Sequence, residues 1–433
     1  MATTAPVAVT TYAYHVGFGD CLLLKFEYTR GARFILIDYG TTKLPPSAGK
    51  SRMADVAKDI KAKVGAKGLH AVIATHRHQD HISGFSTDAN GTGTGDVIAS
   101  LAPKLVVQPW TEDPDLPKDA TGASARGPNG GGQRFARALM GMHRFSAEVV
   151  RFVQSTAGKQ RLSEAARDQL AFIGEDNLSN LSAVKNLMKM GKASRAEYLY
   201  FGAKTRLSTL LPGVKVHVLG PPTIDQHDNV RNQNPKNKDE YWHLAARALG
   251  DSALVGSQRL FPGAETLPGG RLPSYARWLA HRVRQAQEEE LLALLRSMDD
   301  ELNNTSLILL FEIGSKKLLF PGDAQWENWE YALSQDSVRN LLADTNLYKV
   351  GHHGSLNATP KTMWNLLKNK GPTTKKGRLQ TVLSTVPNKH GDEKNNSEVP
   401  RKPLLSELRA QSHLHNTDEL PSDTLYLETR VEI

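Results

Sequence analysis

Short apolar runs that end in polar or glycine-containing turns recur along the chain and predict buried β-strands. The first three runs cover residues 7–15, 21–28 and 33–37. Others of the same kind cover residues 69–74, 105–108, 214–219, 307–313, 317–320, 347–350, 379–385 and 424–431. Because polar side chains follow many of these runs, the pattern predicts an α/β protein whose strand ends carry the candidate chemistry.

Helical spacing separates the predicted strands. Val56, Ile60 and Val64 recur at intervals of four, which predicts a crossover helix over residues 53–64. The pattern is also helical from residue 133 to about 206 and in most of the stretch 223–301. We therefore predict a single domain, residues 1–433, with insertions at about 111–211 and 223–301. Charged helices in such insertions commonly cover a site or contact a protein partner.

Composition limits the class of protein. No apolar run approaches the roughly 20 residues that a membrane span needs, and the N-terminus lacks the basic and apolar regions of a signal peptide. We therefore expect a cytoplasmic protein without membrane insertion. Cys21 is the single cysteine, which excludes an internal disulfide and a cysteine-based zinc site.

The charge of the chain bears on its partners. The formal net charge is +9, which favours anionic partners such as nucleic acid or another phosphodiester. Residues 361–402 contain far more lysine and arginine than acidic residues. A segment of this kind can bind phosphates electrostatically, although an ordinary solvated surface has the same composition.

Four candidate metal ligands follow the predicted strand 69–74 within six residues: His76, His78, Asp80 and His81. Side chains two apart on an extended strand point the same way, so His76 and His78 can bind one ion together. Once the chain turns, Asp80 and His81 leave at a different angle and can reach a second ion. Imidazole and carboxylate together indicate Zn, Mn or Fe rather than Ca or Mg.

Further candidate site residues follow later predicted strands: Asp323, His352, His353 and His390. A glycine precedes Asp323 and lets the backbone turn tightly there. Asp20 and Asp38 also stand where predicted strands start or stop, which is equally consistent with site residues and with turn formers.

Together these motifs resemble the metallo-β-lactamase superfamily, whose His-x-His-x-Asp-His signature corresponds to residues 76–81. The order of the other motifs is similar: residues 37–40, 320–323 and 351–353. Within the superfamily the chain is most similar in look to the hydrolase domain of the bacterial competence DNA-uptake channel, on residues 16–21, 303–307 and 349–355. The resemblance covers residues 8–110, 212–222 and 302–433, and the helical stretches between match no family that we can name.

The resemblance implies an αββα sandwich with a metal site at one edge. The ligands that it implies are His76, His78, Asp80, His81, Asp323 and His353. The first metal would take the first two histidines, the second would take Asp80 and His81, and Asp323 would bridge them. His353 is favoured as the last ligand, which leaves His352 to contact substrate. The ion would be zinc, as one or two ions per chain, with manganese or iron as alternatives.

Two further points follow from the resemblance. Asp38 would orient a ligand imidazole. Most members of the superfamily supply another histidine to the first metal from a segment where Asn303 and Asn304 stand here. The first metal would then have a weaker ligand set, an extra water or a histidine from elsewhere, the candidates being His143, His217, His227 and His243.

These features predict a metal-dependent hydrolase, and foremost a phosphodiesterase or nuclease that acts on DNA or RNA through a two-metal-activated hydroxide. Asp80 would be catalytic, and His352 or His390 would protonate the leaving oxygen. Fold-level analogy suggests a role in DNA processing or in defence. One alternative is a hydrolase of small molecules, such as a cyclic nucleotide, a phosphorylcholine ester or a lactone. Another is a non-catalytic subunit of a larger assembly.

Overall fold

The computed structural model describes residues 5–46, 48–116, 181–227, 303–355, 359–387 and 398–433, with the shorter pieces 122–123, 151–156, 159, 167, 170 and 389. By its internal contacts the chain divides into two compact units. The first comprises Met1–Gly131, Ser179–Val230 and Leu302–Ile433, and the second comprises Gly132–Leu178 and Arg231–Glu301. Every helix and strand named below belongs to the first unit.

One sheet of the described chain has seven strands in the order β13-β1-β2-β3-β4-β5-β6. They are β1 (Ala8–Tyr14), β2 (Cys21–Glu27), β3 (Ala32–Tyr39), β4 (Ala71–Ile73), β5 (Val106–Pro109), β6 (Ala196–Leu199) and β13 (Tyr426–Glu432). Pairs from β13 to β3 are antiparallel, and pairs from β3 to β6 are parallel. All of β4 is buried, which explains its continuous apolar run.

The other sheet has six strands in the order β12-β11-β10-β9-β8-β7. They are β7 (Lys215–Gly220), β8 (Ile308–Ile313), β9 (Lys316–Phe320), β10 (Leu347–Lys349), β11 (Gln380–Leu383) and β12 (His413–Asn416). Strands β7, β8 and β9 are antiparallel, and β9 to β12 are parallel. Both sheets are therefore mixed, and the parallel strands of each deliver their carboxyl ends to one edge.

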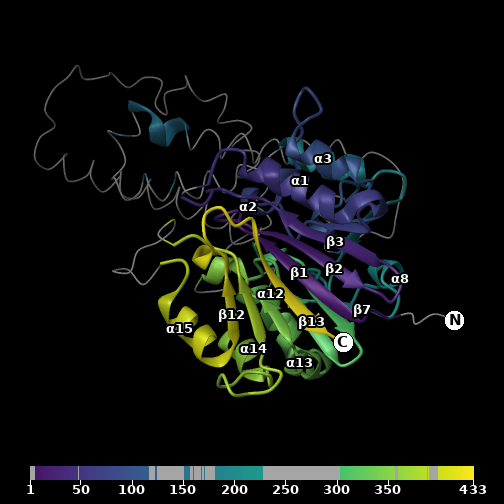
Figure 1. The fold of residues 1–433 in the computed structure, drawn as a ribbon, viewed down its shortest axis with the longest axis vertical. Coiled ribbons are helices and arrows are strands. Elements are labelled where there is room, and N and C mark those ends of the chain that lie inside the picture. Colours follow the sequence, from purple (N-terminus) through teal and green to yellow (C-terminus); the bar gives the residue numbers. More distant parts are fainter. Residues whose placement is uncertain are drawn as a thin grey trace, which may run out of the picture. The chain divides into compact units, whose positions relative to one another are not determined.

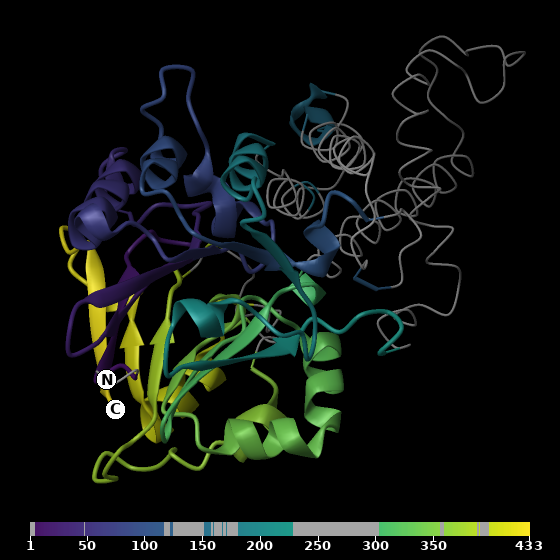
Figure 2. The same cartoon turned by 90° about the vertical axis from the view of Figure 1, so that its right-hand side faces the viewer.

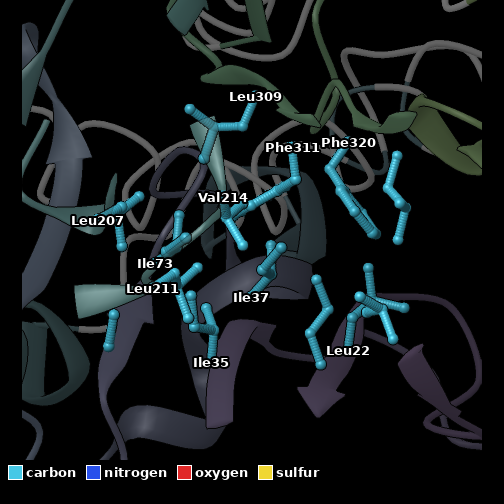
Figure 3. Close-up of a cluster of buried hydrophobic side chains, with 14 of the residues drawn as sticks. Leu22, Ile35, Ile37, Ile73, Leu207, Leu211, Val214, Leu309, Phe311 and Phe320 are labelled. Atoms are coloured by element: carbon cyan, nitrogen blue, oxygen red, sulfur yellow. The ribbon is translucent and has the colours of Figure 1, made fainter. Parts of the chain in front are cut away.

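The main hydrophobic core joins the facing sides of the two sheets (Figure 3). Leu22 and Ile35 from the seven-stranded sheet belong to the same buried cluster as Leu309 and Phe311 from the six-stranded sheet. The ring centroids of Phe26 and Phe311 lie 5.8 Å apart across the two sheets. Full burial of one such side chain contributes about 1.5–3 kcal/mol to stability.

Helices cover the outer sides of the sheets (Figure 1). On the side of the seven-stranded sheet lie α1 (Arg52–Val64), α2 (Gln79–Ile82), α3 (Thr94–Ser100) and α7 (Leu181–Met190). On the side of the six-stranded sheet lie α12 (Trp326–Ser334), α13 (Asp336–Ala343), α14 (Lys361–Leu366) and α15 (Lys402–Gln411). Figure 2 shows the fold turned by 90°. A short helix, α8 (Leu207–Leu210), precedes β7 along the chain.

The packing of α1 and α12 shows how the helices are held. The hydroxyl of Tyr14 in β1 donates to Asp59 of α1 at 2.7 Å. On the other side, Trp329 of α12 is fully buried in one cluster with Leu310 and Tyr348 of the six-stranded sheet. None of the described helices is long and apolar enough to cross a membrane.

The α/β class predicted from the sequence is confirmed. The predicted helix over 53–64 is α1, and the predicted strands 69–74 and 347–350 contain β4 and β10. The prediction of helix as far as residue 206 is wrong at its end, because Ala196–Leu199 forms β6 and extends the sheet beside β5. Strand β12 was not predicted, since its half-exposed sequence carries no clear apolar alternation.

Candidate metal centre

The candidate ligands reach one edge of the fold because three short strands end there. Strand β4 ends at Ile73 and is followed by residues 75–78, and His78 is extended (ψ 151°) at the start of α2. Strand β9 delivers Asp323 after a turn at Gly322, and β10 ends at Lys349, shortly before His353. That glycine has φ +56°, and a Cβ on it would lie 2.8 Å from Cβ of Thr75, so both conformation and space require glycine.

Asp80, His81, Asp323 and His353 form a buried four-residue group whose ligand atoms all lie within 4.8 Å of one another. Nε2 of His81 lies 3.0 Å from Oδ2 of Asp323. Nε2 of His353 lies 2.9 Å from Oδ2 of Asp80 and 3.5 Å from Oδ2 of Asp323. Two imidazole nitrogens thus converge on two carboxylates, an arrangement that can hold a divalent transition metal.

His76 and His78 form a second group with the same Asp80. Nε2 of His76 lies 3.0 Å from Nδ1 of His78. All three side chains are buried. Asp80 therefore belongs to both groups, and the two groups are adjacent.

Other protein groups fix the direction of the imidazoles. Asp38 is buried with a positive φ of 53°, and its Oδ2 lies 2.8 Å from Nδ1 of His81. Nδ1 of His353 lies 2.9 Å from the carbonyl oxygen of Ser384. In both histidines Nδ1 is engaged and Nε2 faces the carboxylates, as ligand histidines require.

The pKa values of the group reflect this crowding. Burial opposes charge on His81, but Asp323, Asp80 and Asp38 outweigh burial and raise the pKa of this imidazole well above its ordinary value. Burial likewise favours the neutral form of Asp323, yet His81 and His353 hold its pKa well below the ordinary value. For His78, burial lowers the pKa to about 4. At neutral pH the carboxylate of Asp323 is thus ionised, and His78 is neutral with one ring nitrogen free of a proton. The raised pKa keeps a proton on His81, which a bound metal would displace.

A buried ion pair lies behind the four-residue group. Lys349, at the end of β10, donates through Nζ to Oδ2 of Asp20, and both side chains are about 1% exposed. Burial lowers the pKa of Lys349, but Asp20 and Asp323 outweigh it and raise this pKa above its usual value. Lys349 is not among the site residues predicted from the sequence, although a lysine inside an apolar strand is a signal in itself.

The structure places the other predicted residues as follows. His352 is half-buried, its backbone N–H donates to Oδ1 of Asp323 at 3.0 Å, and its Nδ1 has no hydrogen-bond partner among the described residues. His217 contacts Glu312 at 2.8 Å. His390, His143 and His243 lie outside the described residues.

His227, the remaining candidate, contacts Glu330 at 3.5 Å. Within the described chain, neither His217 nor His227 joins a group of metal-binding side chains.

The described residues of the basic segment 361–402 make several contacts inside the protein. Lys375 donates to backbone carbonyls of the segment, and Arg378 donates to the carbonyls of residues 371, 409 and 410. Arg401 pairs with Glu398 at 2.6 Å. These cations stabilise the loop and helix ends around them.

No family model matches the chain, and the search of curated proteins found no similar one. The chemistry of the site therefore rests on its own geometry. Buried imidazole nitrogens and ionised carboxylates, with His81 and His353 oriented by neighbouring groups, fit a metal ion, and the donor types suit Zn, Mn or Fe.

Proposed function

We propose that this protein is a metal-dependent phosphodiesterase of the metallo-β-lactamase superfamily, with the αββα sandwich of that family, and that it acts on DNA or RNA. The observation that carries the proposal is the position of Asp80 in two adjacent ligand groups. A carboxylate shared in this way suits a pair of cations, for which we propose zinc, with manganese or iron as alternatives. The motif order described above supports the assignment to this superfamily.

The residues of the chain have separate roles in this proposal. His76 and His78 would hold one cation, and His81 with His353 the other. Asp80 belongs to both ligand groups, and Asp323 belongs to the group of His81 and His353. When bound, two divalent cations lower the pKa of water and neutralise the charge that develops on the attacked phosphorus. A phosphodiester is anionic, so the positive charge of the bound cations would attract it to this site.

His352 would contact the substrate. Its backbone N–H donates to Asp323, which fixes the residue next to the candidate ligands. From this position its imidazole is the candidate to protonate the leaving oxygen, with His390 as the alternative.

The test is hydrolysis of bis-p-nitrophenyl phosphate and single-stranded DNA by the purified chain with added Zn or Mn. Asp80→Ala is expected to lower the rate by about a thousandfold or more, because it removes a ligand common to both groups. Asp336→Ala, a substitution of a 91% exposed side chain in α13, is expected to leave the rate unchanged. Equal rates in wild type and Asp80→Ala would refute the proposal.

A small phosphodiester is a second candidate substrate. The observation that favours it is that Lys375, Arg378 and Arg401 already bind partners within the protein, which leaves fewer cations for a long polyanion. Competition decides between the two: a cyclic nucleotide should be cleaved in preference to single-stranded DNA if the small-molecule function holds.

A further inference from the structure

We propose that the side-chain oxygen of Asn304 completes the first candidate metal group, beside His76 and His78. The inference rests on the metal-dependent function proposed above and deepens it. It makes the two metal positions unequal, with a tight position at the four-residue group and a weaker, oxygen-containing position at the histidine pair.

The chain just after Asn304 contacts both segments that carry the ligands. The N–H of Leu307 donates to the carbonyl of Thr75 at 2.9 Å, directly before His76. On the other side, Cβ of Ser306 lies 3.2 Å from the position that a Cβ on Gly322 would take, directly before Asp323. The end of the turn over residues 303–306, two residues after Asn304, is thus held against both ligand segments.

The amide of Asn304 has a fixed orientation. Its Nδ2 donates to Oε2 of Glu327 at 3.0 Å, and only the nitrogen can donate to a carboxylate. Oδ1 is therefore the atom left for another partner. It is buried and has no hydrogen-bond partner in the described part of the chain, and the residue is 5% exposed.

A buried amide oxygen without a partner costs about 1–3 kcal/mol. Such an atom in a native protein usually has a partner that is not a protein group, and a cation is one such partner. The described histidines that could serve instead are engaged elsewhere, His217 with Glu312 and His227 with Glu330. Asn304, whose turn ends against the ligand segments, is therefore the candidate with an amide oxygen left to bind a cation.

The ligand types predict unequal affinities. The first position would have two imidazoles, a neutral amide oxygen and a share of Asp80. The second would have two imidazoles and two carboxylates, whose charges bind a dication more strongly. An amide oxygen is also a hard ligand, so the first position should accept Mn²⁺ well compared with a site of three histidines.

Titration of the metal-free full chain with Mn²⁺, with free Mn²⁺ followed by electron paramagnetic resonance, tests the inference. Wild type is expected to show a tight and a weaker class of site, with dissociation constants about tenfold or more apart. Asn304→Leu should remove the weaker class and leave the tight one. Asn186→Leu is the matched control, because Asn186 is similarly buried in α7 but its Nδ2 donates to the carbonyls of Phe85 and Gly95. This control should retain both classes.

A second variant guards against a folding defect in Asn304→Leu. Asn304→Asp combined with Glu327→Gln exchanges donor and acceptor between the two side chains and adds a charged oxygen. The dissociation constant of the weaker class for Mn²⁺ should then fall by about tenfold or more. Unchanged binding in both variants would overturn the assignment, and so would a single class of site in wild type that Asn304→Leu does not alter.

The measurement separates this assignment from the proposed function. If the variants change metal binding as stated and no phosphodiester is cleaved, the assignment stands and the phosphodiesterase proposal fails. If phosphodiesters are cleaved and the variants bind Mn²⁺ like wild type, the reverse holds.

Discussion

Oδ2 of Asp38 lies 2.8 Å from Nδ1 of His81, and this contact sets the direction of the imidazole. Asp38 is itself held, because the backbone N–H and the hydroxyl of Thr75 both donate to its carboxylate at 2.7 Å. Nε2 of His81 consequently lies 3.0 Å from Asp323. Asp38 lies outside the four-residue group. By engaging Nδ1 of His81 it directs the other ring nitrogen, Nε2, into that group.

Replacing this carboxylate should weaken metal binding. We expect Asp38→Asn to lower the affinity for Zn²⁺ or Mn²⁺ by about 10- to 100-fold, since an amide is a poorer acceptor for Nδ1–H and can present its nitrogen instead. Competition with a metal-binding dye measures the change. Asp55→Asn, on the exposed side of α1, should bind metal like wild type. Equal affinity in Asp38→Asn would show that His81 is oriented without Asp38.

The buried pair of Lys349 and Asp20 predicts a large loss of stability when one partner is removed. Lys349→Met should lower the free energy of unfolding by about 3–5 kcal/mol, because it leaves the carboxylate of Asp20 buried without its cation. Urea denaturation of metal-free protein measures this. The double variant Lys349→Met with Asp20→Asn should be more stable than the single variant. A double variant less stable than the single one would contradict this account.

His70 predicts a loss of stability in mild acid. Nδ1 of His70 accepts from the N–H of Phe34 at 3.2 Å, and burial, with the nearby cations of Lys104 and Arg33, lowers the pKa of this imidazole to about 4 from 6.5. The unfolded chain therefore binds the proton more readily. Stability from this group is complete above pH 6.5 and is lost as the pH falls towards 4.

The expected loss is on the order of 1–3 kcal/mol. His70→Asn keeps an acceptor near the Nδ1 position and does not titrate in this range. The difference in unfolding free energy between wild type and His70→Asn, measured by urea denaturation from pH 7 to 4.5, should therefore shift in favour of the variant. A difference independent of pH would rule out His70 as the cause.

Gly40 should be intolerant of a side chain. A Cβ there would lie 2.4 Å from the carbonyl carbon of Asp80 and 2.5 Å from the nitrogen of His81. Because these are backbone atoms of the ligand segment, Gly40→Ala should cost about 1–3 kcal/mol or more and weaken metal binding. Thermal unfolding with and without metal measures both effects. Gly49→Ala, whose nearest neighbour would be Oγ of Ser51 at 3.7 Å, is the control and should be near neutral.

Local patterns predicted much of this structure. The candidate ligands of residues 76–81 are predictable because their four side chains are close in sequence. Strand β4 is predictable because a fully buried strand has a continuous apolar run. The pair of Asp20 and Lys349 was not predicted, because 329 residues separate its members and only the fold brings them together. Strand β6 was missed for a similar reason: its pairing with β5 depends on the sheet rather than on its own partly exposed residues.

Strand β13 pairs with β1 along its whole length, with Ala8 opposite Glu432 and Tyr14 opposite Tyr426. During synthesis β1 leaves the ribosome early, but the partner for its outer edge is made more than 400 residues later. At the usual rate of about 5–20 residues per second, this edge stays open for tens of seconds. A nascent chain interrupted before residue 426 would therefore present an unpaired strand to its neighbours, and such edges are sites of aggregation and of chaperone capture.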